Sequence, residues 1–314
     1  MTEVFIGIDC GGTNIRVACG DLQGQILFQR SVLTFSGDDE GDLEEKIISL
    51  VEEAINGMDG DKYAIKGIGM GIPGVVSNGE VLMCPNIGNL KLKELVAYFR
   101  QRHGLDLNVM NDIKCAILGE QWLGAGRGID NFIFVNIGTG LSLAMILDGE
   151  LYFGEDNASG ELGYWVYDVN EKSGFSEGKA PLEDIFSGKG LADRVRDLYG
   201  GDEKAPGLEN VGAINTRWVF EEYGKGNPRV VPVVDEGIGH LIAAIANISI
   251  VLNPRKIVFG GGVSQDIDLF RDRITGYFNK MVPFPPEIEK SSLGREAGIF
   301  GAIRFAILMA GKGK

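Results

Sequence analysis

The sequence predicts an α/β protein of two lobes, each built around a β-meander. Short apolar runs rich in branched residues alternate with segments of helical spacing, which is typical of an α/β fold. The order strand, glycine–threonine loop, strand, turn and strand occurs twice, about 130 residues apart. The chain has 314 residues, enough for about two domains of ordinary size. These three observations favour two related lobes.

The first copy of this pattern begins at the N-terminus. Residues 4–9 form a mostly apolar run and are expected to be a buried strand. They lead into the loop Cys10-Gly11-Gly12-Thr13, and a second strand is expected over residues 14–20. The turn at residues 21–24 connects it to a third strand over residues 25–33.

Three helices and two strands are expected before the pattern returns. Leu43, Ile47 and Val51 keep helical spacing, while the charged residues between them face outward. The other elements are helices at residues 92–99 and 113–122 and strands at residues 65–70 and 107–110.

The second copy begins near residue 131. A strand over residues 131–137 leads into the loop Gly138-Thr139-Gly140, and a second strand follows over residues 141–147. Asp148-Gly149 is a strong hairpin-turn signal. It predicts a third strand over residues 150–154.

The last part of the chain carries clearer signals at its end than at its start. Residues 170–230 are polar and glycine-rich, and only short helices are expected there. A long buried helix over residues 233–252 stops at Asn253-Pro254. A strand over residues 256–259 then runs into Gly260-Gly261-Gly262, and a final helix spans about residues 297–310.

We expect the first lobe to contain residues 1–115 together with the C-terminal helix at about residues 297–314. The second lobe then contains residues 116–296. No interior linker rich in proline or serine separates them, so the connection is expected to be structured.

Composition excludes several classes of partner. The formal net charge of −14 opposes binding to nucleic acid and to anionic lipid.

No stretch approaches the roughly 18 uninterrupted apolar residues of a membrane helix, and no secretory signal is evident. The four cysteines are widely spaced, which favours reduced thiols over disulfides or a zinc knuckle. We expect a cytoplasmic protein.

The glycine–threonine loops are candidates for binding phosphate. Glycine lacks a Cβ atom, so backbone N–H groups can approach an anion closely, and each threonine adds a hydroxyl donor. Taken singly, each loop is explained equally well as a tight hairpin, and neither is a Walker loop. Taken together, the three glycine-rich segments favour a nucleotide site, with these residues: Gly11, Gly12, Thr13, Gly138, Thr139, Gly140, Gly260, Gly261 and Gly262.

Three charged residues near these loops are candidates for chemistry. Asp9 could hold Mg²⁺ through water beside a phosphate, or it could cap the turn. Arg16 could contact phosphate or be a solvated strand residue. Asp112 follows a strand and precedes a helix, where it could act as a general base or as a helix N-cap. Pattern alone leaves these pairs of roles open.

The ordered motifs resemble those of the ROK family of sugar kinases, a branch of the hexokinase/actin-like ATPase superfamily, over nearly the whole chain. The matching segments, in order, are Asp9 to Arg16, Gly71-Ile72-Pro73-Gly74, Pro85-Asn86, Asn111-Asp112, Gly119-Glu120, Gly138-Thr139-Gly140, Gly160-Glu161-Leu162-Gly163, Glu183 to Gly188, Asn253-Pro254 and Gly260-Gly261-Gly262.

This resemblance implies a two-lobed actin/hexokinase-like (ribonuclease H-like) fold with an interlobe cleft. It implies ATP and Mg²⁺ as phosphoryl donor and cofactor, with Asp9 on the metal side. Asp112 would be the general base that takes the proton of a sugar hydroxyl. The residues implied on the sugar side are Gly74, Asn86, Asn111, Asp112, Glu161, Tyr164 and Glu183. Relatives of this family are often homodimers, so a homodimer is implied as well.

Two departures from the family pattern concern zinc. Tyr164 stands where the family usually has a histidine that binds a structural zinc and touches the sugar. Residues 165–182 contain no cysteine, and zinc needs about four nitrogen or sulfur ligands, so no structural zinc is expected. We expect the loop to be held instead by packing of Tyr164, Trp165 and Tyr167.

The resemblance implies ATP-dependent phosphorylation of a hexose, with the 6-hydroxyl of a glucose-like sugar as the first expectation. The Tyr164 departure leaves open a kinase for a glycoside, for fructose or for an N-acetylated amino sugar. A sugar-responsive transcription regulator is the alternative from a different class, and the acidic charge opposes it.

Overall fold

The structure is a computed structural model that describes residues 1–35, 43–77, 80–83, 90–168, 170, 173–201 and 213–312. The chain divides into two compact units. The first unit contains Met1–Gly128, Glu150–Ser159 and Ser292–Lys314, and the second contains Ile129–Gly149 and Gly160–Ser291. The lobe boundary expected at residue 115 falls inside helix α3 (Asp112–Leu123), all of which lies in the first unit.

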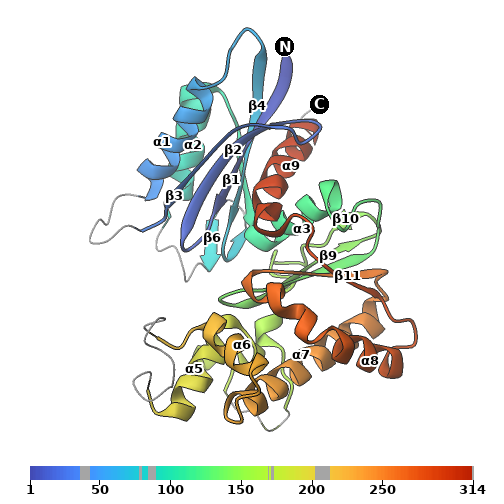
Figure 1. Cartoon of the computed structure of the whole chain (residues 1–314). Coiled ribbons are helices and arrows are strands. Elements are labelled where there is room, and N and C mark those ends of the chain that lie inside the picture. Colours follow the sequence, from blue (N-terminus) through green and yellow to red (C-terminus); the bar gives the residue numbers. More distant parts are fainter. Residues whose placement is uncertain are drawn as a thin grey trace. The chain divides into compact units, whose positions relative to one another are not determined.

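The first unit is built on a five-stranded sheet of order β3-β2-β1-β4-β7 (Figure 1). Its strands are β1 (Thr2–Cys10), β2 (Asn14–Asp21), β3 (Ile26–Leu33), β4 (Tyr63–Ile72) and β7 (Leu107–Asn111). The first three strands form an antiparallel meander, whereas β4 and β7 run parallel to β1. The parallel strands end together at one edge of the sheet, where Asp9 pairs in register with Gly71 and Ile72 with Asn111.

Helices cover both faces of this sheet. Alternate β1 residues such as Ile6 and Ile8 belong to the core formed with α1 (Leu43–Asn56) and α2 (Leu92–His103). The opposite face carries Phe5, which packs with residues of α9 (Ala297–Lys312). Figure 1 shows α1 and α2 on one side of the sheet and α9 on the other.

Glycines allow α9 to lie unusually close to its neighbours. A Cβ atom on Gly69 of β4 would lie 2.1 Å from the Ala302 carbonyl oxygen of α9. One on Gly119 of α3 would lie 2.4 Å from the Ala297 carbonyl oxygen. One on Gly301 would lie 1.6 Å from the Cys115 carbonyl oxygen. At these three glycines the sheet, α3 and α9 therefore come into backbone contact, in addition to the side-chain packing around Phe5.

A second five-stranded sheet has the order β10-β9-β8-β11-β12. Its strands are β8 (Phe132–Ile137), β9 (Leu141–Leu147), β10 (Glu150–Leu151), β11 (Lys256–Gly260) and β12 (Glu287–Lys290). β9 is antiparallel to β8, while β11 runs parallel to β8 and β12 parallel to β11. The two sheets share one order of strands, and the duplicated meander expected from the sequence is confirmed.

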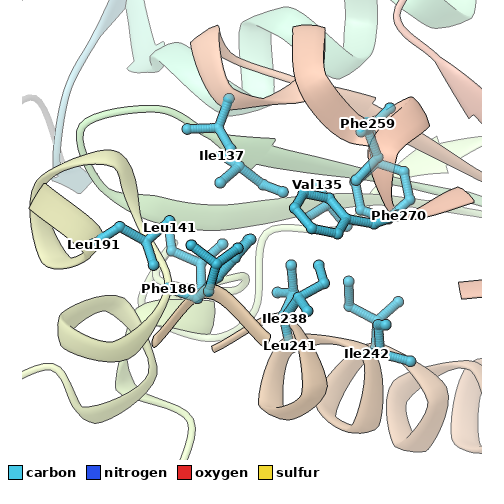
Figure 2. Close-up of a cluster of buried hydrophobic side chains, with 14 of the residues drawn as sticks. Val135, Ile137, Leu141, Phe186, Leu191, Ile238, Leu241, Ile242, Phe259 and Phe270 are labelled. Carbon is cyan, nitrogen blue, oxygen red and sulfur yellow. The ribbon is translucent and has the colours of Figure 1, made fainter. Parts of the chain in front are cut away.

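The core of the second unit lies between its sheet and α7 (Val230–Leu252). Ile238, Leu241 and Ile242 of α7 face Val135 and Phe259 of the sheet (Figure 2). Within the described residues, α7 alone is long and apolar enough to cross a membrane by length and composition, with a mean hydropathy of 1.4. Half of that window is buried inside the protein.

Shorter elements complete both units. The remaining helices are α4 (Pro181–Ile185), α5 (Gly188–Tyr199), α6 (Thr216–Gly224) and α8 (Arg271–Met281), with 3₁₀ turns at Leu162–Tyr164, Phe175–Glu177, Gly262–Leu269 and Gly294–Glu296. A small hairpin of β5 (Val75–Ser77) and β6 (Glu80–Met83) was not expected from the sequence.

The strand expected over residues 150–154 is wrong in its length, since β10 ends at Leu151. The physical reason is local hydrogen bonding. The Phe153 carbonyl oxygen accepts from the Ser159 N–H at 3.1 Å, and the Tyr152 carbonyl oxygen accepts from the Ser159 hydroxyl at 2.8 Å. These backbone groups are paired within their own loop and do not extend a ladder.

Candidate functional site

The first glycine–threonine loop is a tight hairpin in which the carbonyl groups of Gly11 and Thr13 are already bound. The Gly11 N–H donates to the Asn14 carbonyl at 2.9 Å. Thr34, fully buried, donates its hydroxyl to the Gly11 carbonyl at 2.6 Å and its N–H to the Thr13 carbonyl at 2.9 Å. Gly12 and Thr13 are exposed. Thr34 thus holds the loop through hydrogen bonds to two of its carbonyl groups. No local sequence signal indicated this role.

Arg16 binds two carboxylates in this structure. Its guanidinium donates to Asp9 and, at 2.9 Å, to Glu296, which also accepts from Gln29 at 3.0 Å. Asp9 lies against the start of α9, where a Cβ atom on Gly298 would be 2.9 Å from its Oδ2. Burial raises the pKa of Asp9 and outweighs the opposing effect of Arg16. Glu296 lies 280 residues from Arg16, and sequence reasoning missed it.

The fit of Mg²⁺ to this part of the site rests on Asp9. Mg²⁺ keeps several waters and takes only one or two carboxylates together with substrate phosphates. Among the described residues no group of three or more His, Cys, Asp or Glu side chains could hold a metal. One Asp9 oxygen accepts from Arg16, while its carboxylate stands at the end of β1 beside the Gly11–Thr13 loop. A single carboxylate beside a phosphate loop is compatible with magnesium bound through water.

The turn from β7 into α3 positions Asn111 and Asp112. Asn111 is the N-cap of α3, because its Oδ1 accepts from the Ile113 N–H at 2.9 Å and the Lys114 N–H at 3.1 Å. Asp112 is the first residue of the helix and accepts from the Ile113 N–H at 2.9 Å. The N-cap role that competed for Asp112 in the sequence therefore belongs to Asn111.

Gly74 lies beside this turn. Its φ of 101° favours glycine, and its carbonyl oxygen accepts from Nδ2 of Asn111 at 3.0 Å. A Cβ atom on Gly71 would lie 3.3 Å from the Cα of Asp112 and 3.1 Å from the sulfur of Cys115. The end of β4, where the Gly71 to Gly74 motif begins, is thus packed directly against Asp112. Asn86 and Pro85 lie outside the described residues.

The pKa of Cys115 is affected by the charges at this edge of the sheet. Its thiol is fully buried, and its pKa lies well above the usual value because of burial first and then the charges of Asp9 and Asp112. Two carboxylates, Asp9 in β1 and Asp112 at the start of α3, therefore act on one buried atom. The thiol stays protonated and is a poor nucleophile.

The second glycine–threonine loop is held by the segment that begins α5. The Gly188 N–H donates to the Gly138 carbonyl at 2.8 Å, and the Lys189 N–H donates to the Thr139 carbonyl at 3.2 Å. The Gly138 N–H donates to the Gly140 carbonyl at 3.0 Å. The loop is thus a tight turn whose carbonyl groups are occupied, as in the first copy.

Glu183 contacts this loop directly. Its Oε2 accepts from the Leu141 N–H at 2.8 Å, and a Cβ atom on Gly140 would lie 2.6 Å from the same oxygen. A Cβ atom on Gly163 would lie 3.0 Å from the Cβ of Glu183. The structure therefore places Glu183 between the second glycine–threonine loop and the segment Gly160 to Gly163.

Glu161 and Tyr164 lie on that segment. Gly160 has a φ of 96°, and a Cβ atom there would lie 1.9 Å from the Leu143 carbonyl oxygen, so the segment is pressed against β9. The Tyr164 N–H donates to the Glu161 carbonyl at 3.1 Å. Burial raises the pKa of Tyr164, and the charges of Glu161 and Glu183 raise it further. These three side chains are brought together.

The three aromatic residues expected to hold this loop make packing contacts. The Tyr164 ring meets the edge of Phe175 with 5.5 Å between centroids. Trp165 packs on the core of the second unit, and Tyr167 lies 4.4 Å from the His240 ring. Packing of the loop by these aromatics is as expected.

The third glycine cluster divides into two parts. A Cβ atom on Gly260 would lie 2.1 Å from the Phe134 ring, and Gly261 has a φ of 86° with the Ile137 carbonyl 2.4 Å from a Cβ position. Both glycines are therefore explained by packing against β8. Of these three glycines, only Gly262 has no heavy atom within 4 Å of a Cβ position, so the cluster has open space beside its backbone at Gly262.

The predicted site residues thus form two groups, one in each unit. The first unit brings together Asp9, Gly11, Gly12, Thr13, Arg16, Gly74, Asn111 and Asp112. The second unit brings together Gly138, Thr139, Gly140, Glu161, Tyr164 and Glu183, with Gly260, Gly261 and Gly262 at the end of β11.

Comparison with known proteins gives matches along nearly the whole chain. A family model described as the ROK family matches residues 5–308. A glucokinase of Halalkalibacterium halodurans is 28% identical, with 95% of this chain and 93% of that protein covered. A xylose repressor of Caldicellulosiruptor bescii is 24% identical, with 96% of this chain and 78% of that protein covered.

Solved structures of ROK proteins match the fold of this chain. A ROK hexokinase from Thermus thermophilus superposes with a TM-score of 0.83 at 22% identity, over 98% of this chain and 99% of that one. A ROK family glucokinase from Streptomyces griseus, in complex with glucose and AMPPNP, gives a TM-score of 0.74 at 27% identity. That match covers 97% of this chain and 99% of that one.

Proposed function

Because this chain belongs to the ROK family, we propose that it transfers a phosphoryl group from ATP to a hydroxyl of a sugar. Its two-sheet α/β fold is the actin-like ATPase fold of ROK hexokinases and glucokinases. The observation that carries the proposal is that Asn111 and Asp112 have different roles at the start of α3. Asn111 caps the helix, and Asp112 stands beside it at the carboxyl end of a parallel strand.

In the proposed reaction Asp112 is the general base. Its carboxylate accepts the proton of the sugar hydroxyl while the hydroxyl oxygen attacks the γ-phosphorus, and the bond to the β-phosphate oxygen breaks to release ADP. Asn111 holds the turn and the Gly74 loop in place. The glycine–threonine loops offer backbone N–H groups to the phosphates, and Mg²⁺ near Asp9 would neutralise phosphate charge.

Arg16 has two carboxylate partners that a phosphate would compete with. We propose that it keeps Asp9 oriented and lies close enough to the Gly11–Thr13 loop to meet nucleotide phosphate. Gly262, with open backbone, is the proposed contact for the nucleoside among the third glycine cluster.

We propose a glucose-like hexose, phosphorylated at its 6-hydroxyl, as the first substrate class. The support is the glucokinase relative, together with the carboxylate of Glu161 beside Tyr164. Asn86 remains a proposed sugar ligand. Tyr164 keeps a second group of substrates open, namely glycosides, fructose and N-acetylated amino sugars. N-acetyl-D-glucosamine kinases, which are also relatives, support the last of these.

A sugar-responsive regulator is the candidate from another class, because a xylose repressor is among the relatives. The net charge of −14 supports the kinase instead, since DNA carries the same sign of charge. We propose that the kinase acts in the cytoplasm, where ATP is supplied, and as a homodimer. Size-exclusion chromatography with light scattering tests the last point by mass.

A coupled ADP-release assay tests the proposal. Purified protein with ATP and Mg²⁺ is offered glucose, fructose, N-acetylmannosamine, N-acetylglucosamine and cellobiose in separate reactions. We expect turnover that depends on one of these sugars. Absence of sugar-dependent turnover across the panel, with specific binding to promoter DNA, would replace the kinase with the regulator.

A further inference from the structure

The carboxylate of Glu183 accepts a hydrogen bond from the backbone at the end of the second glycine–threonine loop. Its Oε2 accepts from the Leu141 N–H at 2.8 Å, at the point where the loop enters β9. The side chain is only half-buried, yet it is enclosed by two glycines. Cβ atoms at Gly140 and Gly163 would lie 2.6 Å and 3.2 Å from the same oxygen. The two glycine positions make the room that this carboxylate occupies.

The bond is one part of a frame around the loop. From the segment that follows Glu183, the N–H groups of Gly188 and Lys189 donate to the carbonyls of Gly138 and Thr139. The Gly188 carbonyl in turn accepts from the Thr216 hydroxyl at 2.9 Å. The N–H groups at the start of α5 are therefore used to fix the loop and are not available to an anion.

The same frame is anchored in the hydrophobic core. Ile137 and Leu141, on either side of the loop, are buried with Phe186 and Leu191, which follow Glu183 along the chain (Figure 2). The loop thus has fixed ends, fixed carbonyl groups and one charged acceptor at its exit. The N–H groups of Thr139 and Gly140 lie between these fixed points.

We propose that Glu183 is a positioning residue that sets the shape of the Gly138 to Gly140 loop, and so controls nucleotide affinity even when no sugar is bound. This inference rests on the proposed function, in which that loop receives nucleotide phosphate. A free carboxylate beside a phosphate site would repel the ligand, but an acceptor bound to Leu141 preserves the turn. Shape and charge therefore act in opposite directions at this position.

Two substitutions separate these effects. Glu183→Ala removes the acceptor and the loop loses its exit bond, so nucleotide binding should weaken about tenfold or more. Glu183→Gln keeps an amide oxygen for Leu141 and removes the charge, so nucleotide affinity should equal or exceed that of the wild type. Asp184→Ala is the matched control, because it removes the neighbouring exposed carboxylate of α4 and should leave affinity unchanged.

The experiment measures AMPPNP affinity by calorimetry without sugar, together with hydrogen exchange at the Leu141 amide. We expect Glu183→Ala to lose both affinity and Leu141 protection, with Glu183→Gln retaining both. Unchanged affinity in Glu183→Ala, or equal losses in both Glu183 variants, overturns the inference. Failure of the kinase proposal looks different: the wild type then binds AMPPNP normally but phosphorylates no sugar, and the Glu183 comparison can still be read. A wild type that binds no nucleotide overturns both.

Discussion

The side chain of Asn111 donates from Nδ2 to the carbonyl oxygen of Gly74, 3.0 Å away, while its Oδ1 caps α3. One amide thus joins the loop after β4 to the helix that begins with Asp112. Its oxygen caps the helix and its nitrogen binds the Gly74 carbonyl, so a substitution can remove one of these bonds and keep the other.

Asn111→Asp should keep the cap and lose the bond to Gly74. We expect near-normal thermal stability, because aspartate caps helices as well as asparagine does. Sugar turnover should fall at least tenfold, since the Gly74 loop is released and a second carboxylate stands beside Asp112. Asn111→Ala, the comparison, should also lose about 1 kcal/mol of stability. Equal activity of Asn111→Asp and wild type would contradict the role given to the Gly74 bond.

Glu120 is fully buried and accepts from the Ala125 N–H at 2.7 Å and the Leu293 N–H at 3.1 Å. It thereby connects the end of α3 to the segment entering α9. Glu120→Ala leaves these donors without their acceptor and should lower the free energy of unfolding by about 2–3 kcal/mol. Glu120→Gln keeps an acceptor and should lose less. Urea denaturation of both variants measures these losses of stability. Equal stability of Glu120→Ala and Glu120→Gln would refute the role given to the carboxylate as an acceptor.

Two glycines of α9 give a matched pair for the close contact between α9 and α3. A Cβ atom on Gly301 would lie 1.6 Å from the Cys115 carbonyl, whereas one on Gly311 meets nothing within 4 Å. Gly301→Ala should destabilise by about 3 kcal/mol or more through overpacking. Gly311→Ala should be neutral or stabilise by up to about 1 kcal/mol, because alanine favours helix. Similar melting temperatures for the two variants would be evidence against this packing.

Glu52 gives a prediction for pH dependence. A hydrogen bond with His103, at 2.6 Å, and a second from Tyr98 hold the pKa of Glu52 below its ordinary 4.5. A lowered folded-state pKa adds stability above the unfolded pKa, and that stability is lost as pH falls through the folded pKa. Glu52→Gln should therefore lower stability at pH 7 by less than about 1 kcal/mol.

The difference between Glu52→Gln and wild type should shrink as the pH falls below 4.5, the ordinary pKa of the unfolded chain, and should be lost as the pH passes through the lower folded-state pKa. Melting temperatures measured from pH 3 to pH 8 check this. Glu45→Gln, on the exposed face of the same helix, is the control. A difference that grows toward acid would show that the sign is wrong.

Local patterns predicted the elements well because strands, turns and helices leave short-range signals. The paired meanders, the turn at Asp148-Gly149 and the stop at Asn253-Pro254 all follow from neighbouring residues. Partners distant in sequence left no such signal. Glu296 on Arg16 and Thr34 under the first loop became visible only once the chain was folded.

The candidate site shows the same limit. Sequence patterns named Glu183 through its motif, but its bond to Leu141 depends on where two glycines leave space. Likewise Gly260 and Gly261 fit a nucleotide motif, yet packing against β8 already requires them. Residue type indicates available chemistry, and only packing shows which part of it is already in use.

The central claim is that Asp112 is the base of a sugar kinase, and one comparison tests it most directly. Sugar-dependent ADP release is measured for wild type and Asp112→Asn, after both show equal melting temperatures and equal sugar affinity. We predict that the wild type turns over and that Asp112→Asn falls by a factor of about 10² to 10⁴. An Asp112→Asn variant that keeps most of the wild-type rate would contradict the account.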